Sequence, residues 1–204
     1  DMCIGMMLHG GVVAAMGTFF VFSDYMKPAV RIAALMQVPV KFIWTHDAFR
    51  VGEDGPTHEP VEQEAQIRLM EKLKNHAGKD SVRVFRPADA DETTVCWKLA
   101  MENVETPTAL IFSRQGIAKL PEGTDYEQAA KGAYIVAGSD ENPDVILVAS
   151  GSEVSTLEAG CEALRADGIK VRVVSAPSEG LFRGQSKEYQ ESVLPKNAKI
   201  FGMT

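Results

Sequence analysis

Cysteine, clustered positive charge and long apolar runs are all scarce in this chain. The three cysteines are far apart and lack the spacing of a disulfide framework or a zinc site, so a reducing compartment such as the cytoplasm is expected. The formal net charge of -7, without a basic segment, argues against nucleic acid or an anionic membrane as a partner. The longest apolar runs, such as residues 11–22, are shorter than the roughly 20 residues of a membrane span. We expect a cytoplasmic protein that binds neither nucleic acid nor membrane and offers no metal ligands of its own.

What the chain does contain is a repeated alternation of short apolar, β-prone runs with helix-like segments. Its 204 residues, 45% of them hydrophobic, suffice for one large domain or two smaller ones. Strands are expected at residues 12–16, 40–45, 82–85, 108–113, 134–137, 145–149, 170–174 and 199–203. The pattern predicts an α/β fold with two open, mainly parallel-sheet domains and crossover helices. The expected boundaries are 1–116, a linker at 117–131, and 132–204, with the second domain incomplete.

Helix signals fit between these strands. A helix is expected over residues 19–35, and Pro28 within it predicts a kink or a break. Another is expected over residues 60–73. Asp89 and Glu92 have the spacing of a capping box, which predicts a third helix beginning there.

Residues 44–63, here called the histidine loop, read W-T-H-D-A-F-R-V-G-E-D-G-P-T-H-E-P-V-E-Q and follow a predicted strand. Ligands bind at the carboxyl ends of strands in open α/β sheets. His46 and His58 could flank one substrate and exchange protons with it near neutral pH, although each could equally pair with a neighbouring carboxylate. Asp54 could accept hydrogen bonds from sugar-like hydroxyls, but spacing alone favours an ordinary turn residue.

Two further features are candidates for ligand binding. Phe19, Phe22 and Tyr25 recur at every third residue on one side of a predicted helix. Such a face can stack on a flat heterocycle, but aromatic stripes at helical spacing are usually part of a core. Arg114 follows the strand predicted at 108–113, where it could clamp a phosphate or form a surface ion pair.

Taken together, several segments resemble transketolase. They are L-H-G-G at 8–11, T-F-F-V-F-S-D-Y at 18–25, T-H-D and G-E-D-G-P-T-H-E-P-V-E-Q in the histidine loop, R-P-A-D at 86–89, and P-T-A-L-I-F-S-R-Q at 107–115. The resemblance extends from about residue 8 to the end of the chain. It implies that residues 1 to about 116 form a pyrimidine-binding domain and that the remainder opens a carboxyl-terminal domain.

The resemblance also implies roles for the candidate residues. A pocket for the aminopyrimidine of thiamine diphosphate would be lined by Phe19, Phe22 and Tyr25. His46 and Arg114 would bind a sugar phosphate. Asp54 and His58 would contact the hydroxyls of the donor near the reacting carbon, and His58 would be the catalytic residue that stabilises charge or moves a proton there.

Parts of a transketolase site are not found in this sequence. In the family, the glutamate that activates the aminopyrimidine precedes the segment matching Asp1, and an amino-terminal domain holds the diphosphate with Mg²⁺ or Ca²⁺. The resemblance therefore implies a fragment of an enzyme of the pentose phosphate pathway, inactive alone, that moves a two-carbon ketol unit from a ketose phosphate to an aldose phosphate. Its expected partner is a second copy in a homodimer or an amino-terminal transketolase half. A non-catalytic dimerisation or binding module of the same fold is the alternative.

Overall fold

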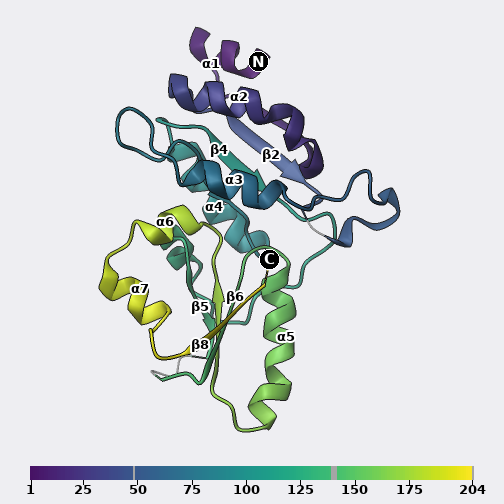
Figure 1. Cartoon of the computed structure of the whole chain (residues 1–204), viewed down its shortest axis with the longest axis vertical. Helices are drawn as coiled ribbons and strands as arrows, with labels where there is room; N and C mark the ends of the chain where they lie inside the picture. The colour runs from purple at the N-terminus through teal and green to yellow at the C-terminus, as the bar shows by residue number, and fades with distance from the viewer. Residues whose placement is uncertain (48, 139–141, 204) are drawn as a thin grey trace. The chain divides into compact units, whose positions relative to one another are not determined.

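The computed structural model describes residues 1–47, 49–138 and 142–203 (Figure 1). They form two compact units, Asp1–Phe85 with Trp97–Gly116 and Arg86–Cys96 with Ile117–Thr204. Each unit contains an open four-stranded sheet with helices, so the predicted α/β class is confirmed. Within the described residues, no helix combines the length and the apolar character needed to cross a membrane.

The first unit is built on an all-parallel sheet with the strand order β1-β2-β4-β3. Its strands are β1 (Ala15–Phe19), β2 (Lys41–Thr45), β3 (Arg83–Phe85) and β4 (Thr108–Ile111). Its helical elements are α1 (Met2–His9), η1 (Phe20–Phe22), α2 (Ser23–Met36), η2 (Phe49–Asp54), α3 (Gln63–Glu71) and the end of α4 (Ala90–Glu102). Because the strands are parallel, the segments that follow β1, β2 and β4 all leave the same edge of the sheet.

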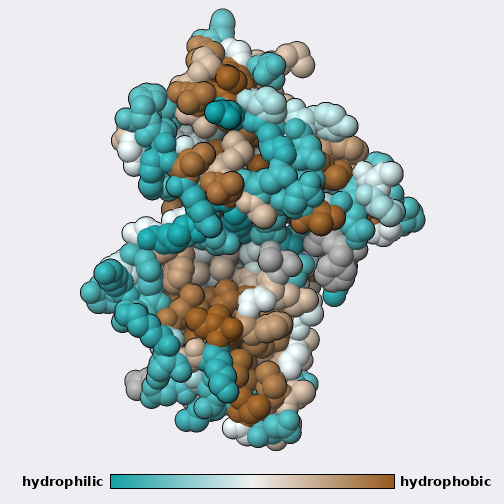
Figure 2. Space-filling view, in the orientation of Figure 1, coloured by the Kyte–Doolittle hydropathy of each residue, from teal (hydrophilic) through white to brown (hydrophobic). Residues whose placement is uncertain are grey.

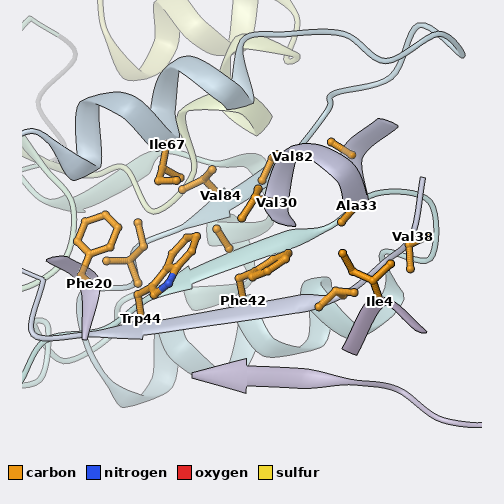
Figure 3. Packing of buried hydrophobic residues seen from close by; sticks show 14 residues of the cluster. Ile4, Phe20, Val30, Ala33, Val38, Phe42, Trp44, Ile67, Val82 and Val84 are labelled. Carbon is orange, nitrogen blue, oxygen red and sulfur yellow. The ribbon is translucent and has the colours of Figure 1, made fainter. Parts of the chain in front are cut away.

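An apolar core holds α1, α2 and α3 against this sheet (Figure 3). Phe42 and Trp44 of β2 pack in one cluster with Val30 of α2 and Ile67 of α3, and all four side chains are fully buried. Each such side chain contributes about 1.5–3 kcal/mol by leaving water. The core therefore fixes the position of β2, from which the histidine loop emerges.

The segment after β1 differs from the prediction. A strand was expected at 12–16 and a helix from Phe19, but β1 extends to Phe19, a single 3-10 turn follows, and α2 begins at Ser23. The reason is the ladder with β2, in which Phe19 pairs with Thr45. Backbone pairing with a neighbouring strand thus extends the strand through Gly17 and Thr18, which were expected to form a turn.

α2 is one continuous helix through Pro28, so the predicted division into two helices is wrong, while the alternative of a kink stays a prediction. Pro28 removes one backbone donor from the helix. Val30 and Ala33, just beyond it, are completely buried in the core. Their packing holds the following turns in place despite the lost hydrogen bond.

The second unit has a mixed sheet with the order β5-β7-β6-β8, in which only the β5–β7 pair is antiparallel. Its elements are η3 (Tyr126–Lys131), β5 (Tyr134–Ala137), β6 (Val145–Ala149), α5 (Glu153–Ala166), β7 (Val171–Ser175), α6 (Glu179–Arg183), α7 (Lys187–Val193) and β8 (Lys199–Met203). β8 lies at the sheet edge, and its Ile200 and Phe201 side chains are exposed. Figure 2 shows a hydrophobic area on the surface of this unit.

A buried ion pair joins the start of segment 86–96 to α5. The Nη2 atom of Arg86 lies 2.7 Å from Oε2 of Glu153, and its Nη1 donates to the carbonyl oxygen of Ser150 at 2.9 Å. A Cβ on Gly151, whose φ is +60°, would lie 2.8 Å from the Arg86 guanidinium. The close approach of this arginine therefore requires glycine in the turn before α5.

A second buried group is Glu92, in the first turn of α4. Asp89 accepts the backbone N–H of Glu92 at 2.9 Å, which confirms the predicted cap. The Glu92 carboxyl accepts hydrogen bonds from Tyr134 Oη at 2.8 Å, Ser175 Oγ at 2.7 Å and the backbone N–H of Ala88 at 2.5 Å. Burial raises its pKa from 4.5 to about 7, and the nearby Asp89 charge adds to the rise while these hydrogen bonds oppose it.

Candidate functional site

Aromatic side chains after β1 lie beside both histidines of the histidine loop. The rings of Phe19 and His46 stack with centroids 3.7 Å apart and an interplanar angle of 22°. His58 stands edge-on to Phe19 and Phe22 at centroid distances of 5.9 and 5.3 Å. Phe22 in turn lies 6.1 Å from Tyr25. The structure thus brings together five residues singled out in the sequence, although Phe19 belongs to β1, Phe22 to η1 and Tyr25 to α2.

This aromatic cluster is not part of the core. Tyr25 is 82% exposed, and Phe19, Phe22, His46 and His58 are partly exposed. An accessible aromatic face bordered by imidazoles can stack on a flat heterocycle and supply hydrogen bonds at its edge.

Two threonines orient the histidine rings. Thr45 Oγ1 lies 2.9 Å from Nδ1 of His46, and Thr57 Oγ1 lies 2.8 Å from Nδ1 of His58. A ring engaged at Nδ1 can present Nε2 to a ligand. The backbone of His46 has a φ of 62°, which is uncommon for a residue other than glycine. Neither threonine was among the predicted site residues, although each directly precedes its histidine.

Arg114, which follows β4, lies against the glycine-rich turn of the histidine loop. Its Nε atom is 4.0 Å from Oδ2 of Asp54, and its Nη2 atom is 3.5 Å from Oε1 of Glu53. A Cβ on Gly52, whose φ is +87°, would lie 3.4 Å from the guanidinium carbon. The structure thus brings the predicted Arg114 and Asp54 together. The Arg114 side chain is 39% exposed, so an incoming anion could reach it.

These two groups of side chains come from the same edge of the first sheet. The histidine loop supplies His46, Asp54 and His58, while β1 and β4 lead into the aromatic residues and Arg114. Among residues 1–47, 49–138 and 142–203, no group of three or more His, Cys, Asp or Glu side chains is arranged to hold a metal ion. The chemistry that this part of the chain offers is stacking, proton exchange and anion binding.

Comparison with known families identifies the class of protein to which this fold belongs. The family described as "Transketolase, pyrimidine binding domain" matches residues 1–119, and the one described as "Transketolase-like TK C-terminal domain" matches residues 132–204. The first match places the chain in the thiamine diphosphate-dependent class.

Individual relatives point to one family within that class. Transketolase of Halalkalibacterium halodurans is 50% identical over 195 residues, which are 95% of this chain and 28% of that protein. The solved structure of transketolase from Leishmania mexicana matches with a TM-score of 0.88 and 37% identity, over 98% of this chain and 28% of that one. A solved "Split gene transketolase, inactive beta4 tetramer" matches with a TM-score of 0.65 and 26% identity, over 87% of this chain and 53% of that one. The chain belongs to the transketolase family and spans 28% of the length of the first of these relatives.

Proposed function

We propose that this chain supplies the pyrimidine-binding half of a transketolase active site. The complete enzyme would move a two-carbon ketol unit from a ketose phosphate to an aldose phosphate. The observation that carries the proposal is the exposed cluster of Phe19, Phe22, Tyr25, His46 and His58 in a chain of this family. Because the chain spans 28% of its relative's length, we propose that it is inactive alone.

The aromatic cluster fits the aminopyrimidine ring of thiamine diphosphate. Phe19 and Phe22 offer stacked faces, with ring centroids 6.4 Å apart, and Tyr25 extends this surface with a hydroxyl-bearing ring. We assign these three side chains to holding the ring. When bound, the cofactor supplies a carbanion that attacks the ketose carbonyl. We propose that residues outside this chain hold the diphosphate and its Mg²⁺ or Ca²⁺.

His58 is the proposed catalytic residue. Its ring stands edge-on to Phe22, and Thr57 engages Nδ1, so the other ring nitrogen can face a sugar hydroxyl or carbonyl beside the cofactor. An imidazole there can donate or accept a proton near neutral pH. Asp54 is proposed to accept hydrogen bonds from the hydroxyls of the donor sugar.

Arg114 and His46 are proposed to bind the phosphate of the sugar. The guanidinium can form two parallel hydrogen bonds to phosphate oxygens. Glu53 and Asp54, at 3.5 and 4.0 Å, partly neutralise Arg114 before the ligand arrives. A doubly charged phosphate can compete with them because it combines charge with the fork-shaped geometry that suits arginine.

A second polypeptide is the proposed partner, either another copy in a homodimer or an amino-terminal transketolase half. Exposed apolar residues on and just after α1 support it, namely Met2, Met6, Leu8, Val12 and Val13. Figure 2 shows apolar surface in the region of α1. The three free cysteines support a location in the reducing cytoplasm.

A non-catalytic assembly module is the second candidate function. It is favoured by the description of the split-gene relative as an inactive tetramer. The two candidates differ in whether ketol transfer appears when the missing half is supplied.

Ketol transfer from xylulose 5-phosphate to ribose 5-phosphate tests the proposal. The assay contains thiamine diphosphate and Mg²⁺, and compares the chain alone, an amino-terminal transketolase half alone, and their mixture. Activity only in the mixture is the expected result. Turnover by this chain alone would contradict the proposed dependence on a partner, and silence of a mixture that demonstrably associates would favour the assembly module.

A further inference from the structure

Two hydrogen bonds connect the ends of β2 and β4 and the segments that follow these strands. A backbone bond there runs from the N–H of Phe112 to the carbonyl oxygen of Trp44, at 2.7 Å. Three residues after Trp44, the side chain of Asp47 accepts a hydrogen bond from Ser113 Oγ at 3.2 Å. Asp47 is only 5% exposed. The Asp47 end of this part-buried bond is therefore largely shielded from competing water, which increases its effect on the local geometry.

This bond lies next to both proposed phosphate ligands. His46 falls between the two connections, since Trp44 precedes it and Asp47 follows it. Arg114 directly follows Ser113, just beyond the second of these two hydrogen bonds. The Asp47–Ser113 bond thus connects the segment that follows His46 to the segment that leads into Arg114.

The conformation of His46 explains why such a connection is needed. Its left-handed φ of 62° is unfavourable for a side chain with a Cβ and persists only when neighbouring contacts hold it. The stack on Phe19 and the contact with Thr45 orient the ring. The Asp47 side chain anchors the backbone on the carboxyl side of His46.

We propose that Asp47 and Ser113 are positioning residues that set the spacing between His46 and Arg114 for recognition of the sugar phosphate. Neither side chain is assigned a contact with the substrate. The inference rests on the proposed function and adds to it the device by which two separate loops present one phosphate site. Loss of the Asp47–Ser113 hydrogen bond should therefore weaken the binding of a ligand in proportion to the share of its affinity that comes from its phosphate group.

The test measures binding of ribose 5-phosphate and of ribose to this chain by NMR titration, observed at the Arg114 side-chain N–H and at the backbone amides. In the unsubstituted chain, ribose 5-phosphate should bind more tightly and shift the Arg114 signal. Ser113→Ala should weaken ribose 5-phosphate binding by about 5-fold, because the hydrogen bond to a charged acceptor is lost. It should leave ribose binding unchanged.

Two variants serve as controls. Ser113→Thr keeps the hydroxyl and should retain the affinity for ribose 5-phosphate, while Asp47→Asn keeps an acceptor oxygen and should lose less than Ser113→Ala. An equal loss for both sugars would indicate general disruption and overturn the inference, as would unchanged binding by a folded Ser113→Ala chain. Absence of ribose 5-phosphate binding to the unsubstituted chain would also overturn it, whereas the proposed function is decided separately by ketol transfer in the mixture.

Discussion

Replacing Glu92 with glutamine should remove a pH-dependent loss of stability from the second unit. The Glu92 carboxyl is fully buried, and burial raises its pKa from 4.5 to about 7. In the unfolded chain the same carboxyl ionises freely near 4.5. Between these two pH values, the unfolded chain has lost a proton that the folded chain still binds.

The sign and size of the effect follow from linkage. Because the folded state binds more protons in this window, the free energy of unfolding falls as the pH rises from 4.5 to about 7. Each pKa unit is worth about 1.4 kcal/mol, so the full loss is about 3 kcal/mol. Glutamine cannot ionise, and its amide can still accept from Ala88 and donate to the hydroxyl groups of Tyr134 or Ser175. Glu92→Gln should therefore gain stability relative to the unsubstituted chain across this window.

The assay is urea unfolding at several pH values, followed by pulsed hydrogen exchange and mass spectrometry of peptides from β5, β6 and β7. All labelling pulses are given at one pH, so the read-out does not depend on the pH of unfolding. Asp91→Asn, one residue away with a side chain that is 48% exposed, is the matched control, and its pH profile should run nearly parallel to that of the unsubstituted chain. Profiles of the unsubstituted chain and of Glu92→Gln that run parallel from pH 4.5 to 7.5 would refute the reasoning.

Two more substitutions test the packing of the same unit by urea unfolding. Arg86→Met should destabilise it by about 3–5 kcal/mol, because Glu153 stays buried without its partner. Adding Glu153→Met should restore most of the lost stability. No recovery in the double variant would contradict this interpretation. Gly132→Ala places a Cβ 2.3 Å from the backbone oxygen of Ser178, so it should destabilise by more than about 3 kcal/mol. Gly168→Ala, also at positive φ but in open space, should cost only about 1–2 kcal/mol, and equal losses at both glycines would count against the steric argument.

The strands were predictable where burial alone determines them. Most side chains of β2 and β6 are buried, and strands that are covered on both faces read as nearly continuous apolar runs. β1 was misplaced because its last residues, Gly17 to Phe19, have a sequence typical of a turn followed by a helix. Pairing with β2 decides their conformation, and a sequence gives no direct view of a partner strand.

The candidate site was predictable to the extent that its residues follow strand ends. His46, His58 and Arg114 were singled out on that ground, and the structure places each beside another predicted residue. Their supporting contacts were not foreseen. The bond from Ser113 to Asp47 joins residues 66 positions apart, and only the adjacency of β2 and β4 brings them together.

Buried charge was the other feature that sequence reasoning could not locate. Glu92 was identified as a helix-capping residue, and glutamate is rarely buried without a partner. Its burial depends on Tyr134 and Ser175, which lie 42 and 83 positions away. Contacts at such separations arise from topology, so they could be found only in the folded unit.

The most direct test of the central claim is the effect of His58→Gln on ketol transfer in the mixture with an amino-terminal transketolase half. His58 belongs to the aromatic cluster, whereas His76, in a loop elsewhere in the first unit, is the matched control. His58→Gln is expected to lower kcat/KM by about 100-fold or more, whereas His76→Gln is expected to change it little. Full activity of a folded, associated His58→Gln variant would contradict the proposed site.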